Sequence, residues 1–176
     1  MLYNKYLQDF IDNRVFVKLY TERYNESFFG FIFTFTDDFL LFENYNNNSM
    51  ENGIIVFYRE NITKIRWEGN ELNHLQKLIK TPRISGLEKI ELYNIQTIIS
   101  SVQLLFGHIN IYTEDIDDDV CYIGEVDDLD DFVVVLNEFG NPNTSDRKKV
   151  LINIHNITKV EANGIYEKNL LEIYDI

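Results

Sequence analysis

Apolar residues along this chain recur at helical spacing in four segments. The first runs from residue 2 to 11 and the second from 92 to 105, with Gly107 at the place where a helix would stop. Two shorter and more polar segments, 70–80 and 166–174, close the two halves of the chain. The pattern therefore predicts one helix before and one helix after each group of strands.

Between these helices the chain consists of short apolar stretches that alternate with polar turns, as in strands. A glycine interrupts the second stretch of each half, Gly30 in one and Gly124 in the other, and indicates a sharp bend of the strand. Each half is thus predicted to hold five short strands. They are 15–19, 28–35, 39–42, 54–58 and a stretch ending at Trp67, then 109–111, 120–126, 132–136, 150–154 and a stretch around Val160.

Several short segments occur twice at a nearly constant offset. The clearest is Asn61–Lys64, which returns as Asn156–Lys159. A self-match at such a period indicates two copies of one small domain. We place the copies at residues 1–83 and 84–176, because the segment between them contains the Pro82 and the glycine of a boundary.

The second strand of the first half, residues 28–35, is apolar on both faces. A five-stranded sheet that contains such a strand must cover both faces, and closing a strongly bent sheet into a small barrel would do so. The predicted fold class is therefore mainly β with helices (α+β). It consists of two tandem, strongly bent five-stranded barrels, each preceded by an N-terminal helix.

This order of elements and two short motifs resemble the Sm-like family of small β-barrels. The first motif lies at Gly30, Ile32 and the acidic turn Asp37–Asp38, and the second lies at residues 56–61. The resemblance implies a helix on a bent five-stranded barrel in each copy. It also implies that strand edges pair with a neighbouring copy, either within one chain or in a homo-oligomer.

RNA binding is the activity that the resemblance implies for the first copy. Sm-like proteins hold RNA with an Asp, an aromatic residue and an Asn in one loop and an Arg-Gly pair in another. Here Leu40 stands at the Asn position and Glu60 stands where Gly is expected, while the second copy has neither the amide nor the cation. The residues left for this alternative function are Arg59, Asn61, Lys64 and Arg66.

The composition is that of a globular protein, with 45% apolar residues, 13 Phe and 11 Tyr. The single cysteine, Cys121, excludes an internal disulfide and favours a reducing compartment. No segment has the length of a secretion signal or of a transmembrane helix. We therefore expect a cytoplasmic protein that does not associate with membranes.

Negative charge is concentrated in the second half. Residues 1–105 carry 11 basic and 13 acidic side chains (net −2), whereas residues 106–176 carry 5 and 16 (net −11), in agreement with the total of −13. Such a field disfavours nucleic acid and favours a basic protein partner, although a solvated acidic loop that only aids solubility is the alternative. The acidic face expected to bind the partner comprises Asp115, Asp117, Asp118, Asp119, Asp127, Asp128, Asp130 and Asp131.

The alternation of Asp115, Asp117 and Asp119 is also that of a calcium loop. Val120 and Val126 stand, however, where such a loop needs its glycine and its bidentate glutamate. The three histidines lack metal-ligand spacing, and no nucleophile with a base beside it is apparent. We expect no metal, no cofactor and no catalytic residue.

These observations favour a non-enzymatic cytoplasmic protein that acts by protein–protein interaction. The partner would be a basic protein bound at the acidic face, as in an accessory or immunity-type role. RNA binding by the first copy is the alternative. Trp67 and Arg59 have ordinary structural interpretations, as a packing anchor between the copies and as a strand-end side chain that reaches water.

Overall fold

The chain forms two compact units, Met1–Leu87 and Glu88–Ile176. The division falls shortly after the boundary predicted between residues 83 and 84. Each unit is described separately. The computed structural model describes residues 1–21, 26–80, 83–116, 120–139 and 147–174.

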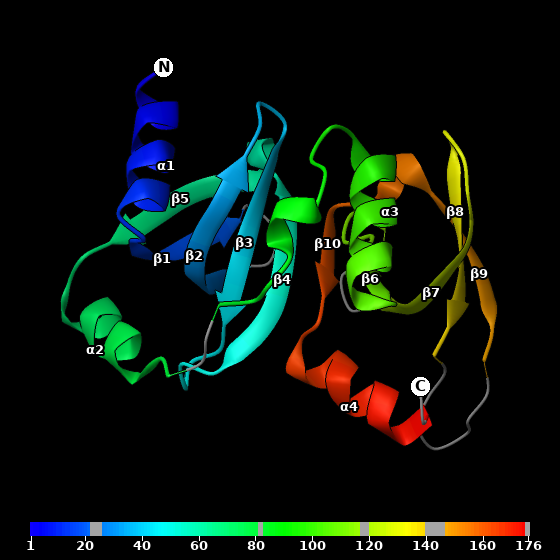
Figure 1. Cartoon of the computed structure of the whole chain (residues 1–176). Coiled ribbons are helices and arrows are strands. Elements are labelled where there is room, and N and C mark those ends of the chain that lie inside the picture. Colours follow the sequence, from blue (N-terminus) through cyan, green and yellow to red (C-terminus); the bar gives the residue numbers. More distant parts are fainter. Residues whose placement is uncertain (22–25, 81–82, 117–119, 140–146, 175–176) are drawn as a thin grey trace. The chain divides into compact units, whose positions relative to one another are not determined.

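Unit 1 contains five strands between two helices (Figure 1). The strands pair in the order β5-β1-β2-β3-β4, and every pair is antiparallel. A short 3₁₀ turn, Arg59–Asn61, joins the last two strands. The elements are α1 (Leu2–Asp12), β1 (Phe16–Thr21), β2 (Ser27–Phe35), β3 (Phe39–Tyr45), β4 (Glu51–Tyr58), β5 (Ile62–Trp67) and α2 (Asn70–Leu78).

Both faces of this sheet are covered by helices. Leu7 and Phe10 of α1 belong to one apolar cluster, which includes Phe42 of β3. Leu72 of α2 belongs to a second cluster with Phe16 of β1. Alternate side chains of a strand point to opposite faces, so a strand that is apolar throughout, such as β2, is buried from both sides.

Unit 2 repeats the antiparallel arrangement with a helix before and a helix after the strands (Figure 1). Its strands pair in the order β10-β6-β7-β8-β9. The elements are α3 (Ile95–Phe106), β6 (Ile109–Tyr112), β7 (Cys121–Leu129), β8 (Val133–Glu138), β9 (Lys149–Asn153), β10 (Lys159–Ala162) and α4 (Ile165–Tyr174).

Caps fix the ends of α3, and apolar faces fix how α3 and α4 pack in unit 2. Asn94 and Thr97 form a capping box at the start of α3, and Gly107 ends the helix with a φ of 76°. Ile99 of α3 is buried, and Leu170 of α4 packs against Ile123 of β7. The sequence pattern predicted all four helices and all ten strands, and these elements are confirmed with bounds shifted by a few residues.

The glycines inside β2 and β7 lie where two backbones come close together. A Cβ atom on Gly30 would lie 1.9 Å from the backbone oxygen of Glu43, and one on Gly124 would lie 2.4 Å from that of Asn137. Only glycine fits such an approach. The bend predicted at these strands takes the form of a register shift just beyond each glycine.

The predicted closure into barrels is wrong, because the strands form open antiparallel sheet. Among the described residues, no pairing joins β4 to β5 in unit 1 or β9 to β10 in unit 2, as closed five-stranded barrels would require. The prediction of an internal duplication of small Sm-like barrels is wrong with it. The reasoning failed because the second apolar face of each sheet is covered by a helix, α2 or α4, and closure is not needed to bury it.

Candidate functional site

The free edge of unit 1 carries a candidate binding surface. β5 pairs with β1 on one side and, within the described residues, with no strand on the other. Between β5 and α1 lies a cavity of about 200 Å³, which we call the edge cleft. It is lined by Tyr3, Tyr6, Phe10, Ile62, Thr63, Lys64, Ile65 and Trp67.

Aromatic residues make up half of the lining of the edge cleft, and some of their rings remain partly open to solvent. The ring centroid of Trp67 lies 5.7 Å from that of Tyr6 and 5.1 Å from that of Phe10. Trp67 and Tyr6 are nevertheless 41% and 43% exposed. Trp67 therefore anchors α1 to β5 within unit 1, in place of the packing anchor between copies expected from the sequence, and still presents part of its ring to a ligand.

Basic side chains occupy the opposite face of the same strand. Lys64 and Arg66 lie across from Tyr20 and Lys18 of β1 in the strand register. The Lys64 ammonium is 4.0 Å and the Arg66 guanidinium carbon 5.3 Å from the centroid of the Tyr20 ring. Lys64 and Arg66 are exposed, and neither makes an ion pair with another described residue.

Arg59 is held inside unit 1, away from this basic pair. Its guanidinium donates hydrogen bonds to Asn4 Oδ1 (2.7 Å) and to the backbone oxygen of Thr36, and it lies over the rings of Tyr3 and Phe35. Only 10% of the side chain is exposed. Arg59 thus ties α1 to the β2–β3 turn, in contrast to the solvent-reaching side chain expected from the sequence.

The structure therefore divides the residues suggested for RNA binding. Lys64 and Arg66 lie together on one face of β5, whereas Arg59 is engaged with α1. Asn61 is half-buried in the 3₁₀ turn before β5. The pair on β5 has a ring beneath it, but the two cations already cover that ring.

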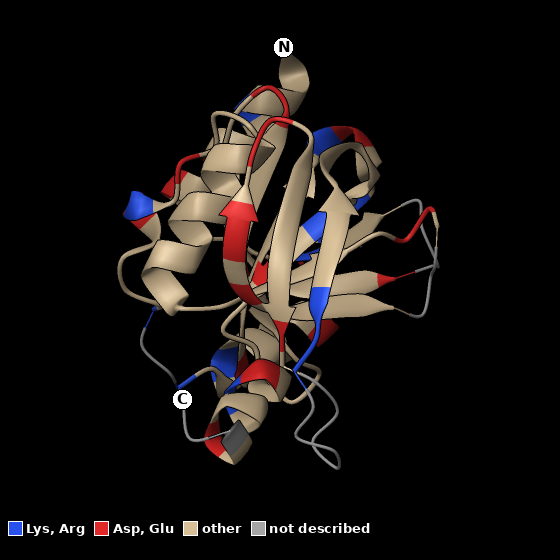
Figure 2. Ribbon diagram, turned by 90° about the vertical axis from the view of Figure 1, so that its right-hand side faces the viewer, with Lys and Arg blue, Asp and Glu red and all other residues tan. Residues whose placement is uncertain are grey.

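The acidic residues of unit 2 gather on the β7–β8 hairpin, where Figure 2 shows them along β7 and at the tip. Asp127, Asp128, Asp130 and Asp131 are all exposed, as is Asp115 before β7. Asp117, Asp118 and Asp119 lie outside the described residues.

Several of these residues already have partners within the described part of unit 2. Asp127 forms an ion pair of 2.7 Å with Lys149 of β9. Asp130 accepts hydrogen bonds from the backbone N–H groups of Phe132 and Val133, which lower its pKa below the ordinary value. Asp128 Oδ1 accepts a hydrogen bond of 2.9 Å from the Leu129 N–H, so Asp131 is the described member of the acidic face with the least evident structural task.

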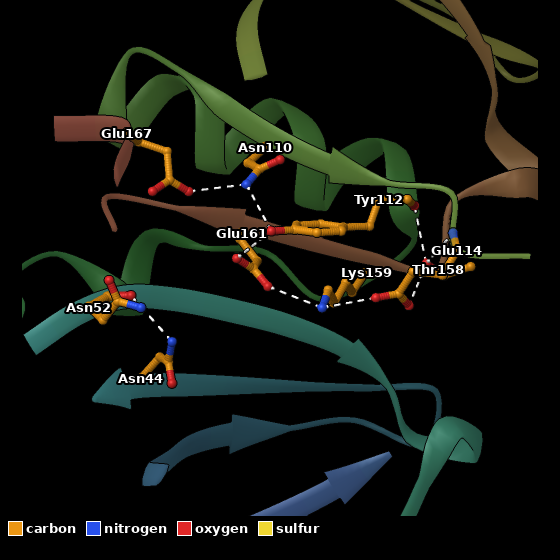
Figure 3. A network of polar contacts seen from close by, with 9 residues as sticks. All are labelled: Asn44, Asn52, Asn110, Tyr112, Glu114, Thr158, Lys159, Glu161 and Glu167. Carbon is orange, nitrogen blue, oxygen red and sulfur yellow. Dashed lines mark hydrogen bonds and ion pairs between the residues drawn. The ribbon is translucent and has the colours of Figure 1, made fainter. Parts of the chain in front are cut away.

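A buried charged network in unit 2 was not expected from the sequence (Figure 3). Lys159 contacts Glu114 at 2.9 Å and Glu161 at 3.4 Å. The Tyr112 hydroxyl donates to Glu161, and Asn110 donates to both Tyr112 and Glu167. These residues come from β6, β10, α4 and the segment after β6, so only strand pairing brings them together.

Burial governs the protonation of this network. The pKa of Glu161 is raised to about 7, mainly by desolvation and also by the nearby Glu167, while the opposing Lys159 and the Tyr112 hydrogen bond lower it. Desolvation also raises the pKa values of the Tyr112 hydroxyl and the Cys121 thiol. Tyr112 therefore remains a hydrogen-bond donor at neutral pH, and the Cys121 thiol is a poor nucleophile.

A second buried acid lies in unit 1. The Glu43 side chain is fully buried, and Arg83 donates two hydrogen bonds to one of its oxygens at 2.8 and 3.0 Å. Arg14 lies 3.6 Å from the other oxygen. The arginine pair compensates the burial of this charge, so the group stabilises the join between β3 and the segment after α2.

The histidines have structural or solvent positions. His108 is buried, with Nδ1 3.0 Å from the Phe106 oxygen and Nε2 accepting from the Asn163 N–H. Burial lowers its pKa, so it is neutral. His74 and His155 are exposed. Over the described ranges, no three His, Cys, Asp or Glu side chains are grouped as a metal site would require.

No known protein family, curated protein or solved structure matches this chain. The resemblance to the Sm-like family stays a prediction from short motifs. Among the described helices, none has the length and apolar character to cross a bilayer. The case for function therefore depends on the surfaces and clusters themselves.

Proposed function

We propose that this chain is a non-enzymatic cytoplasmic protein that acts by protein–protein interaction. The observation that carries the proposal is the free edge of β5 beside the edge cleft. An exposed strand edge offers unpaired backbone groups to another chain, and exposed aromatic rings beside it supply apolar contact area. The free edge and the aromatic rings lie on the same strand. Proteins that bind a partner segment as an added strand use the same combination of backbone pairing and side-chain pockets.

The buried network of unit 2 supports a structural interpretation of its ionisable residues. Its carboxylates are engaged with Lys159, Tyr112, Asn110 and Thr158 inside the unit. A catalytic acid or base must instead reach a substrate.

A test of the proposed function is an unbiased selection of displayed random peptides on the intact chain, followed by amide hydrogen exchange. Binders that protect the amides of β5 (62–67) from exchange support the proposal. If all selected binders protect other segments and leave β5 unchanged, the proposal is wrong. Hydrogen exchange is chosen because added main-chain hydrogen bonds slow exchange at the strand that receives them.

The acidic face of unit 2 is a second proposed contact surface, for a basic partner. It is supported by the exposure of Asp128 and Asp131 beside Phe132, which is 67% exposed at the hairpin tip. Asp128→Asn/Asp131→Asn should weaken binding of an oligo-lysine peptide, while Asp9→Asn/Asp12→Asn on α1 removes the same charge elsewhere. Equal losses in both variants would show a general charge effect and would exclude the hairpin as the contact surface.

A further inference from the structure

The two faces of β5 differ in chemistry, and this difference defines a ligand. Ile65 and Trp67 lie opposite the buried Leu19 and Val17 of β1, on the face that holds the edge cleft. Lys64 and Arg66 alternate with them and face Tyr20 and Lys18 of β1, and Lys64 also borders the edge cleft. Along one strand the side chains therefore alternate between an aromatic cleft and a pair of cations.

Building on the proposed function of this edge, we infer that β5 binds an extended acidic peptide as an added strand. The peptide alternates apolar and acidic residues. Its backbone pairs with the free edge of β5. Its apolar side chains enter the edge cleft, and its carboxylates lie beside Lys64 and Arg66.

Charge complementarity selects an acidic ligand over a neutral one. β5 carries two cations and no carboxylate, although the whole chain has a net charge of −13. Both cations are exposed and held over the Tyr20 ring, so their positions are set before a ligand arrives. The nearby Lys18 is already opposed by Glu71 at 3.9 Å, which leaves the pair on β5 as the main local attraction.

The same geometry favours a peptide over single-stranded nucleic acid. Stacking of bases needs an open ring face, whereas Tyr20 lies under Lys64 and Arg66. Trp67 is packed on Tyr6 and Phe10 and is 41% exposed. A polyphosphate backbone would also offer no N–H groups to the edge of β5, which an added strand pairs in full.

The length of the strand sets the length of the ligand. β5 has six residues, so at about 3.3 Å per residue it spans about 20 Å. A peptide of eight residues would cover this edge, with one apolar and one acidic residue for each pair of positions on β5. Trp67 is the single tryptophan of the chain, so its fluorescence reports directly on the edge cleft.

The test is a titration of the intact chain with an eight-residue peptide of alternating Glu and Val, followed by Trp67 emission. We expect a blue shift and saturable binding. Lys64→Glu/Arg66→Glu should weaken binding at least tenfold, while Lys77→Glu/Lys80→Glu, at exposed sites on and just after α2, should change it less than twofold. A peptide N-methylated at the alternate amides that point toward β5 should lose binding, because it cannot complete the strand ladder, whereas methylation of the other alternate set should be tolerated.

Three results of such titrations would overturn the inference. One is equal binding of a Lys-Val peptide, which would remove the charge argument. Another is unchanged binding of the peptide N-methylated at the amides that point toward β5, which would remove strand addition. The third is a single-stranded oligouridine that binds more tightly than the acidic peptide and is weakened by the same double variant. Displayed peptides that protect β5 but lack acidic residues would refute this inference alone, whereas no protection at β5 would refute the proposed function as well.

Discussion

Glu161 should make the stability of this protein depend on pH near neutrality. Its carboxylate shares one ammonium, Lys159, with Glu114, and lies near Glu167. Burial is the largest cause that raises its pKa, from 4.5 to about 7. The attraction of Lys159 and the hydrogen bond from Tyr112 only reduce this rise.

The sign of the effect follows from the protons bound in each state. Between pH 4.5 and about 7 the folded protein keeps a proton on Glu161 that the unfolded chain releases. The free energy of unfolding therefore falls as pH rises through this window, and the loss is complete above it. A shift from 4.5 to about 7 corresponds to about 3 kcal/mol at about 1.4 kcal/mol per pKa unit.

Glu161→Gln removes the titrating group while it keeps a side chain of similar size. The difference in unfolding free energy between the wild type and this variant should change by about 3 kcal/mol between pH 4.5 and pH 8. Glu172→Gln, at an exposed position on α4, should keep the pH dependence of the wild type. Urea unfolding followed by far-UV circular dichroism at several pH values measures both.

The reasoning fails if Glu161→Gln retains the full pH slope of the wild type between pH 4.5 and 7. Such a result would mean that Glu161 is ionised in the folded protein, so that Lys159 outweighs burial. A change in the m-value rather than in the midpoint would point to altered compactness and would also contradict the assignment.

Three further predictions concern packing and reactivity. Gly30→Ala should lower the free energy of unfolding of unit 1 by about 3 kcal/mol, because its Cβ would stand 1.9 Å from a backbone oxygen. Gly69→Ala has open space around its Cβ but a φ of 97°, so it should lower that free energy by about 1 kcal/mol. Thermal unfolding measures both. Arg59→Met should lower the free energy of unfolding by about 2 kcal/mol and speed amide hydrogen exchange in α1, because the hydrogen bond to Asn4 is lost. As a control, Arg66→Met should leave hydrogen exchange in α1 unaltered. Cys121 should react slowly with iodoacetamide at pH 8 and at least tenfold faster in urea; equal rates would contradict the burial of its thiol.

The secondary structure could be predicted from the chain because its signals are local. Helical spacing of apolar residues located α1 and α3, and Gly107 marked the end of α3. Gly30 was recognised as a special position, although the reason for it, the close backbone of Glu43, belongs to a neighbouring strand. Local periodicity thus sufficed for the elements, while the contact that explains the glycine needed the sheet.

The candidate site could be predicted only in part. Lys64 and Arg66 were named from the sequence as basic residues left for RNA binding under the Sm-like resemblance, and the structure places them together on β5. The exposure of Trp67 and the withdrawal of Arg59 into unit 1 depend on how α1 lies against the sheet. Spacing along the chain could not show these positions.

The sequence by itself determined which segments form helices and strands, with bounds correct to within a few residues, since periodicity, caps and turn residues act locally. Only the tertiary structure decided that helices, not barrel closure, cover the second face of each sheet. It also decided which polar groups are desolvated: Asn110 and Glu161 are far apart in the sequence and are brought opposite each other by the pairing of β6 with β10. Desolvation is a property of everything packed around a group, and no local pattern contains that information.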